Sequence, residues 1–195
     1  MKTTHLITLF GFLVACDEGG NASETGAEAE EPAPFALSSS AFEAEGTIPL
    51  PHECGAPIFP NGPGENITPP LSWTDGPSET ASYAIVMRDL DFTPDAYPDG
   101  LIHWVIYDIP ADMLELSEDI DDGAEIDGGL RQGELQNTDF FGYLGPCSPD
   151  SVNTYEFTVH AMGEATLPVE AQDEITVTDY VEGNSIAQTS LAGES

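Results

Sequence analysis

The segment Gly64–Trp73 reads Gly-Glu-Asn-Ile-Thr-Pro-Pro-Leu-Ser-Trp and constrains the fold more than any other part of the chain. Thr68 and Pro69 each precede a proline, which biases their backbones toward extended geometry. Neither Pro69 nor Pro70 can donate a backbone hydrogen bond, so this segment cannot be helical. We expect it to be a fixed, extended entry into a β-strand.

Short runs rich in β-branched and aromatic residues follow, separated by turns that contain glycine and proline. The clearest predicted strands are Tyr83–Arg88, Leu101–Ile109 and Thr154–Ala161. Apolar residues at helical spacing within Thr178–Leu191 predict a C-terminal helix. The acidic stretch Asp112–Gly129 is expected to be a loop with one helical turn near Met113–Ser117. The sequence therefore predicts a mainly β domain with few short helices.

The predicted strand Leu101–Ile109 is largely apolar on both faces, which is typical of a strand covered on two sides. Strict alternation places Leu101, His103, Val105, Tyr107 and Ile109 on one face, and Ile102, Trp104, Ile106 and Asp108 on the other.

The first sixteen residues have the pattern of an export signal. Lys2 is followed by the apolar run Leu6–Ala15, which at about ten residues is too short to span a membrane. The sequence Leu13-Val14-Ala15-Cys16 resembles a bacterial lipoprotein cleavage box, in which the cysteine becomes the lipid-modified first residue. An ordinary secretory signal with a chance cysteine is the alternative. We expect residues 1–16 to be a signal peptide, 17–34 a disordered acidic tether, and 35–195 one folded domain.

The chain carries 36 acidic residues against three lysines and arginines, for a formal net charge of −33. This charge argues against nucleic acid and against close approach to anionic lipid head groups. A saline habitat would also explain it. Partners are expected to be neutral, zwitterionic, cationic or locally shielded.

If Cys16 carries lipid, Cys54 and Cys147 remain as an even pair in an exported protein, which favours a disulfide. Two free or metal-binding thiols are the alternative, although the sequence has no Cys-x-x-Cys motif or nearby Cys/His cluster.

Four separated motifs occur in the order found in one known family. They are Gly64–Trp73; Asp89-Leu90-Asp91; His103-Trp104-Val105 leading to Asp108-Ile109-Pro110; and Gly145-Pro146-Cys147-Ser148-Pro149 followed by Tyr155. From Phe35 onward the chain resembles the phosphatidylethanolamine-binding protein family, in its bacterial YbhB/YbcL, Raf kinase inhibitor-like branch. The resemblance implies a β-sandwich-like fold. It also implies a small pocket for an anionic or zwitterionic ligand, such as phosphate or a phospholipid head group.

By position, the resemblance assigns six residues to that pocket: Asp89, Asp91, His103, Gly145, Pro146 and Tyr155. A carboxylate would orient the histidine, and the histidine together with backbone amides of the Gly-Pro turn would donate hydrogen bonds to an anion. Without the resemblance, His103 suits a core histidine, the two aspartates suit a turn cap, and Tyr155 suits the core.

The chain departs from the family pattern at four places. Leu90 stands where the acidic loop usually has proline, Leu101 where a pocket-wall tryptophan usually lies, and Asn153 where a second histidine is usual. The loop Phe92–Gly100 is also longer than usual. Without that histidine the pocket lacks a possible positive charge, and without that tryptophan it lacks a flat wall. We therefore expect a pocket that binds phosphate less well than is usual in the family.

Motifs of hydrolases, zinc proteases and phosphate-cradling loops are missing from the sequence. We therefore expect a binding protein that is not an enzyme, with no catalytic residues, no cofactor and no metal. A hard cation held by Asp89, Asp91 and His103 is a less favoured alternative, and so is catalysis by the same residues.

The expected location is the cell envelope, with a lipid anchor on the periplasmic face or outer surface. The alternative function is inhibition of a protease or kinase through surface loops, with the target unknown.

Overall fold

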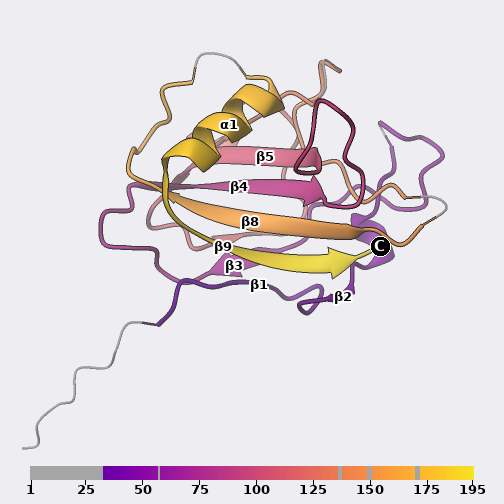
Figure 1. The fold of residues 1–195 in the computed structure, drawn as a ribbon, viewed down its shortest axis with the longest axis horizontal. Coiled ribbons are helices and arrows are strands. Elements are labelled where there is room, and N and C mark those ends of the chain that lie inside the picture. Colours follow the sequence, from indigo (N-terminus) through magenta and orange to yellow (C-terminus); the bar gives the residue numbers. More distant parts are fainter. Residues whose placement is uncertain (1–32, 57, 136–137, 149–150, 170–171) are drawn as a thin grey trace, which may run out of the picture. The chain divides into compact units, whose positions relative to one another are not determined.

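The computed structural model describes residues 33–56, 58–135, 138–148, 151–169 and 172–195, and Ala33–Ser195 form one compact unit (Figure 1). The predicted lipidation site Cys16, the signal peptide and residues 17–32 of the predicted tether lie outside the described residues. Within the described ranges, the one α-helix is too short and too polar to cross a bilayer.

In chain order the elements are β1 (Leu37–Ser39), β2 (Gly46–Thr47), the 3-10 helix η1 (Leu50–His52), β3 (Leu71–Trp73), β4 (Ser82–Asp89), β5 (Leu101–Pro110), β6 (Glu115–Leu116), the 3-10 helix η2 (Asp127–Gly129), β7 (Arg131–Gln132), β8 (Thr154–Met162), α1 (Glu174–Asn184) and β9 (Ser185–Glu194).

The described strands form two sheets. A small sheet has the order β1-β3-β6, and a larger one has the order β2-β9-β8-β4-β5-β7. The strand pairs are antiparallel except β2 with β9. All three predicted strands are confirmed as β4, β5 and β8, and Gly64–Trp73 leads into β3 as expected.

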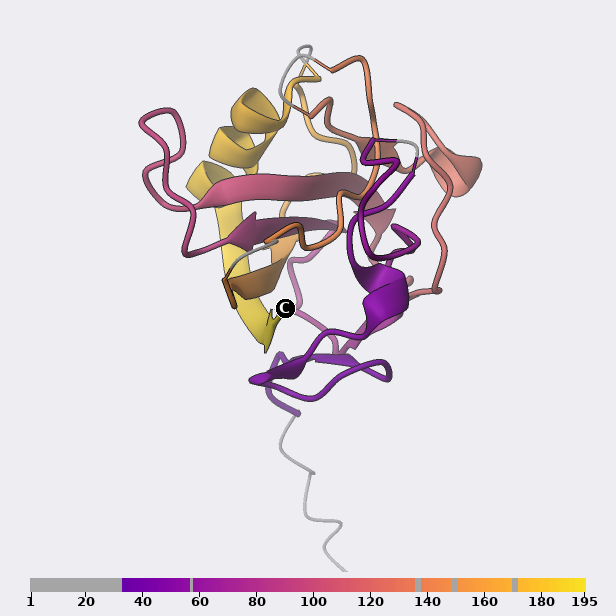
Figure 2. The same cartoon turned by 90° about the vertical axis from the view of Figure 1, so that its right-hand side faces the viewer.

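The larger sheet is covered on both faces. One buried cluster, which includes Trp73, Trp104 and Phe157, fills the space between the two sheets. A second cluster, which includes Tyr107 and Val177, lies between the larger sheet and α1. Figures 1 and 2 show α1 on one side of the sheet and β1 and β3 on the other. This arrangement explains why β5 is apolar on both faces, because each face meets a covering layer.

A β-bulge in β5 corrects the predicted faces of that strand. Ile106 pairs with Ile85 and Ile109 pairs with Tyr83, so β5 carries one extra residue in this stretch. Asp108, within the bulge, has φ of 62°, a left-handed conformation that aspartate tolerates better than most residues. As a result Ile109 joins the core between the sheets and not the Tyr107 face.

The C-terminal helix exists, but it lies earlier than predicted. It begins after Asp173, whose side chain caps the helix by accepting a 2.9 Å hydrogen bond from Thr176 N. It ends at Asn184, and the residues from Ser185 onward form β9, which pairs along β8. Pairing with a central strand overrides the helical spacing of the apolar residues in this segment.

The acidic stretch also differs from expectation. Glu115 and Leu116 form β6 against β3, whereas a helical turn was predicted there. The 3-10 turn lies instead at Asp127–Gly129, where Gly128 has φ of 87°.

Candidate functional site

The candidate site is a cavity at the end of the larger sheet where β4 ends and β5 and β8 begin. Its volume is about 470 Å³. Asp89 ends β4 and pairs with Leu101 at the start of β5 and with Tyr155 near the start of β8. The pairing register therefore brings motifs that are far apart in the sequence to one edge of the sheet.

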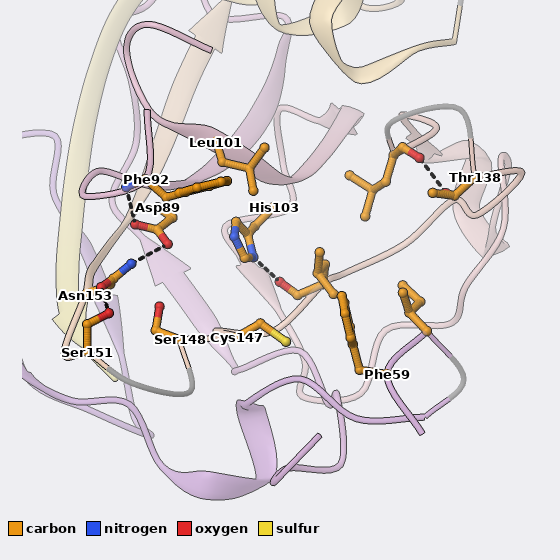
Figure 3. A pocket seen from close by; sticks show the side chains of 13 residues that line it. Phe59, Asp89, Phe92, Leu101, His103, Thr138, Cys147, Ser148, Ser151 and Asn153 are labelled. Carbon is orange, nitrogen blue, oxygen red and sulfur yellow. Dashed lines mark hydrogen bonds between the residues drawn. The ribbon is translucent and has the colours of Figure 1, made fainter. Parts of the chain in front are cut away.

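The cavity is lined by polar and apolar side chains, and Figure 3 shows Asp89 and Asn153 at one end and Thr138 at the other. The polar side chains that line it are Asp89, His103, Thr138, Ser148, Ser151 and Asn153. The apolar lining is Ile58, Phe59, Phe92, Leu101, Leu135 and Leu144, together with the half-cystine Cys147. A cavity of this composition suits a ligand with both polar and apolar parts.

Asp89 is 3% exposed, and its carboxylate is held by three donors. The backbone N–H groups of Asp91 and Phe92 donate to Oδ1 at 2.9 and 3.1 Å. The side-chain amide of Asn153 donates to Oδ2 at 2.8 Å. These contacts fix the turn after β4 and hold the carboxylate at the cavity wall.

His103 is oriented by a backbone carbonyl. Its Nδ1 lies 3.0 Å from Leu144 O, and because a carbonyl can only accept, Nδ1 carries the proton. Burial lowers the pKa of His103 below its usual value of 6.5, although the hydrogen bond to Leu144 and the charge of Asp89 act in the opposite direction. At neutral pH the ring is therefore neutral, and its Nε2 is an acceptor.

Tyr155 supports the site from behind. It is fully buried, and its ring lies nearly perpendicular to the His103 ring, with centroids 5.2 Å apart. Its hydroxyl accepts a 3.1 Å hydrogen bond from Cys147 N and shares a 2.8 Å hydrogen bond with Ser148 Oγ. Burial raises the pKa of Tyr155. Tyr155 thus positions both the histidine ring and the loop after Pro146.

The Gly-Pro turn does not aim its amides at the cavity, contrary to the sequence prediction. Gly145 N donates to Asn66 Oδ1 at 2.9 Å, and Cys147 N donates to Tyr155. A Cβ atom at Gly145 would lie 2.3 Å from His52 O, so only glycine fits this close approach. Pro146 lacks an N–H altogether. The turn is a packed wall, and the polar groups of the cavity are side chains.

Asn66 was missed by the sequence analysis although it lies within Gly64–Trp73. It has φ of 60°, and its amide nitrogen donates to Tyr143 O at 2.7 Å while its oxygen accepts from Gly145. An asparagine shortly after the Pro63-Gly64 pair is the signal that would have indicated a left-handed position. Asn66 therefore fastens the first motif to the last.

Cys54 and Cys147 form a disulfide, with Cα atoms 5.3 Å apart, which confirms the predicted pairing. Cys54 N also donates to Pro146 O at 2.8 Å. The segment after η1 is thus joined to the wall of the cavity both covalently and by a backbone hydrogen bond.

Of the six residues that the resemblance assigns to the pocket, the structure places only some at the cavity. Asp89 and His103 line the cavity, Tyr155 and Gly145 lie behind its wall, and Pro146 lines an adjacent cavity. Asp91 is exposed, and its carboxylate accepts a 2.7 Å hydrogen bond from Thr154 N, which ties the loop to β8. The described residues include no group of three or more His, Cys, Asp or Glu side chains placed to hold a metal.

Both arginines lie away from this cavity. Arg88 pairs with Glu182 of α1, and Arg131 donates to Asp108 Oδ2 at 2.6 Å. Among the described residues that line the cavity, Asp89 is therefore the charged side chain, and no lysine or arginine accompanies it.

Comparisons with known proteins agree with this architecture. Residues 38–195 match the sequence family described as phosphatidylethanolamine-binding protein. A UPF0098 protein of Methanothermobacter thermautotrophicus is 34% identical over 158 residues, which cover 80% of this chain and 95% of the relative. The UPF0098 protein YbcL of Escherichia coli is 31% identical over 134 residues, covering 66% of this chain and 70% of YbcL.

Two solved structures share the fold. The crystal structure of CT736, a phosphatidylethanolamine-binding protein homologue from Chlamydia trachomatis, superposes with a TM-score of 0.65 at 30% identity and covers 83% of this chain and 96% of that one. Escherichia coli YbcL superposes with a TM-score of 0.67 at 25% identity and covers 83% of this chain and 98% of that one. The chain belongs to the phosphatidylethanolamine-binding protein family.

Proposed function

We propose that this protein binds a small zwitterionic head group in the cavity beside Asp89 and His103. The observation that carries the proposal is the charge of the lining, in which a buried carboxylate is accompanied by a neutral histidine and by no described cation. Burying an anion next to that carboxylate would be costly, because nothing at hand neutralises it. An ammonium group, by contrast, finds an opposite charge at Asp89 and an acceptor at His103 Nε2.

The same cavity offers a place for the anionic half of a zwitterion. Ser148 and Ser151 line it near the carboxylate, and Ser151 Oγ already donates to Asn153 Oδ1 at 2.7 Å. The Ser148 hydroxyl can accept from Tyr155 and turn its own hydrogen toward a phosphate oxygen. The ligand class that fits is therefore a phosphoester with a primary ammonium group, of the kind found in a phospholipid head group. A simple phosphate fits less well.

This role is binding and not catalysis. Asp89 already accepts three hydrogen bonds, and Ser148 pairs with Tyr155, so neither has the base-and-nucleophile pairing that hydrolysis uses.

The proposal includes export and tethering to a membrane of the cell envelope through lipid on Cys16. That part is tested by radiolabelled palmitate, which should label the full chain and fail to label Cys16→Ala.

The binding proposal is tested by calorimetric titration with glycerophosphoethanolamine, a head group without tails. We expect saturable binding, and His103→Ala should weaken it by roughly tenfold, the loss of one buried hydrogen bond. Ile186→Ala, which truncates an exposed side chain on β9, is the control and should bind normally. Unchanged affinity in a folded His103→Ala would remove His103 from the site, and no binding to the unaltered protein would overturn the proposal.

Exposed apolar side chains support a second candidate, inhibition or capture of another protein through the surface loops. Leu90 is 38% exposed, Phe92 53% and Val152 72%, and all three lie on segments next to the cavity. Exposed apolar side chains that cluster are typical of interaction surfaces. A stoichiometric envelope protein that is captured equally well by His103→Ala, and lost with Phe92→Ala, would favour this function.

A further inference from the structure

A second cavity adjoins the proposed head-group site. Its volume is about 320 Å³, and Phe59, Cys147 and Ser148 line both cavities. The remaining wall of the second cavity consists of three prolines, Cys54 of the disulfide, Gly62 and three polar residues: Pro60, Pro63, Pro146, Cys54, Gly62, Glu53, Asn61 and Ser195. The two spaces are therefore neighbours, with the Phe59 ring and the disulfide between them.

The walls of the second cavity are built into the fold. Gly62 N donates to Phe59 O at 2.8 Å, and Gly64 N donates to Cys54 O at 3.0 Å. A Cβ atom at Gly62 would lie 2.2 Å from Cys54 O, so the chain packs as tightly as glycine allows. With the disulfide these contacts hold the cavity open without a ligand, as is usual for binding sites.

Phe59 is the movable part of the boundary. Its backbone N–H donates to Gly55 O at 2.8 Å, whereas its side chain is 42% exposed. An exposed aromatic ring on a fixed backbone can change rotamer at little cost. Such a rotation would join the two cavities along the disulfide.

We infer that the second cavity holds the apolar part of the same ligand, so that the full site accepts a single-chain amphiphile whose tail passes Phe59. This inference rests on the proposed head-group function. The order of the lining fits, since the buried carboxylate of Asp89 lines the first cavity, whereas the prolines Pro60 and Pro63 supply apolar wall to the second. Glu53 also lines the second cavity, which disfavours a ligand with an anionic group at the far end of its tail.

The test is a series of lysophosphatidylethanolamines with increasing tail length, titrated below their micelle-forming concentrations beside tail-free glycerophosphoethanolamine. We expect affinity to rise about fourfold for each methylene buried, and then to level off when the cavity is filled. Asn61→Trp places a large ring at the exposed edge of the second cavity. It should abolish the dependence on tail length and leave glycerophosphoethanolamine affinity unchanged.

Phe59→Ala joins the cavities and should strengthen binding of the longer tails. The matched control is Leu50→Ala, which truncates another exposed apolar side chain, on η1, and should leave binding unchanged because Leu50 lines neither cavity. If glycerophosphoethanolamine binds but affinity is flat with tail length, this inference fails and the head-group proposal stands. A tail-length dependence that Asn61→Trp leaves intact also overturns it. If none of the probes binds, the head-group proposal itself fails.

Discussion

The side-chain amide of Asn153 donates a 2.8 Å hydrogen bond to the carboxylate of Asp89, and both side chains are buried. In the family resemblance drawn from the sequence, Asn153 stands where a histidine is usual. The amide satisfies the carboxylate without adding a positive charge to the cavity. This pair therefore explains how the fold keeps a buried carboxylate at the site, and it supports the proposal that the site takes a cationic group and not an anion.

Replacement of Asn153 by alanine should destabilise the protein by about 1–3 kcal/mol, because it leaves the buried Asp89 Oδ2 without its donor. Urea unfolding followed by circular dichroism measures the change. Asn184→Ala is the control, since it removes a single hydrogen bond to Tyr180 O at an exposed position and should cost less than about 1 kcal/mol. Equal losses in the two variants would contradict a structural role for the Asn153–Asp89 pair.

Removal of the Asn66 side chain should loosen the connection between Gly64–Trp73 and the cavity wall. Asn66→Ala loses the hydrogen bonds to Tyr143 O and Gly145 N and puts alanine at a positive φ, so we expect a loss of about 2–4 kcal/mol. Asn66→Gly loses the same two hydrogen bonds without strain at the positive φ, so it isolates the hydrogen bonds and should cost about 1–3 kcal/mol. Chemical denaturation of both variants measures the losses, and a cost below about 0.5 kcal/mol for Asn66→Gly would count against the clamp.

His160 should make stability depend on pH. The ring is 1% exposed, neither nitrogen has a hydrogen-bond partner among the described residues, and burial together with the nearby Arg88 lowers its pKa to about 4. In the unfolded chain the ring titrates near 6.5, so the unfolded state binds more protons between these values. Stability is therefore fully present above pH 6.5 and falls as the pH drops toward 4, by up to about 3 kcal/mol.

The His160→Leu variant isolates this effect, because the other titrating groups are common to both proteins. The free energy of unfolding of His160→Leu relative to the unaltered protein should rise by about 3 kcal/mol between pH 7 and pH 4. A difference that stays constant across this range would show that His160 does not titrate as described.

Replacement of both Cys54 and Cys147 by serine should cost about 4–5 kcal/mol in the chain-entropy description, since the disulfide closes a loop with a sequence separation of 93. Thermal and urea unfolding of the double variant measure the loss. Reduction of the unaltered protein provides the comparison and should give a similar value. A loss below about 1 kcal/mol would mean that neighbouring contacts, such as Cys54 N to Pro146 O, already hold the two segments together.

Much of the fold could be predicted because local chemistry and tertiary pairing agree. The prolines of Gly64–Trp73 exclude helix, and the apolar runs of β4, β5 and β8 match strands that are buried in the sheet. Prediction failed where hydrogen bonding between strands that are far apart in the sequence decides the structure. The residues from Ser185 onward have helical spacing but pair along β8, and Ile109 changes face because of the bulge at Asp108.

The candidate site was predicted only in part for a similar reason. Motif positions indicate which residues gather at one edge, and Asp89 and His103 do line the cavity. They do not indicate which donors and acceptors already form hydrogen bonds within the protein. The backbone N–H groups of Gly145 and Cys147 donate to Asn66 and Tyr155, and only the three-dimensional structure shows these bonds.

Head-group selectivity shows whether the cavity beside Asp89 takes a cationic group. Calorimetry should compare glycerophosphoethanolamine, glycerophosphocholine and inorganic phosphate on the unaltered protein and on Asp89→Asn. We expect glycerophosphoethanolamine to bind most tightly, because its ammonium group can donate hydrogen bonds to Asp89 and His103, and we expect Asp89→Asn to remove this preference. Tighter binding of inorganic phosphate than of glycerophosphoethanolamine to the unaltered protein would contradict this expectation.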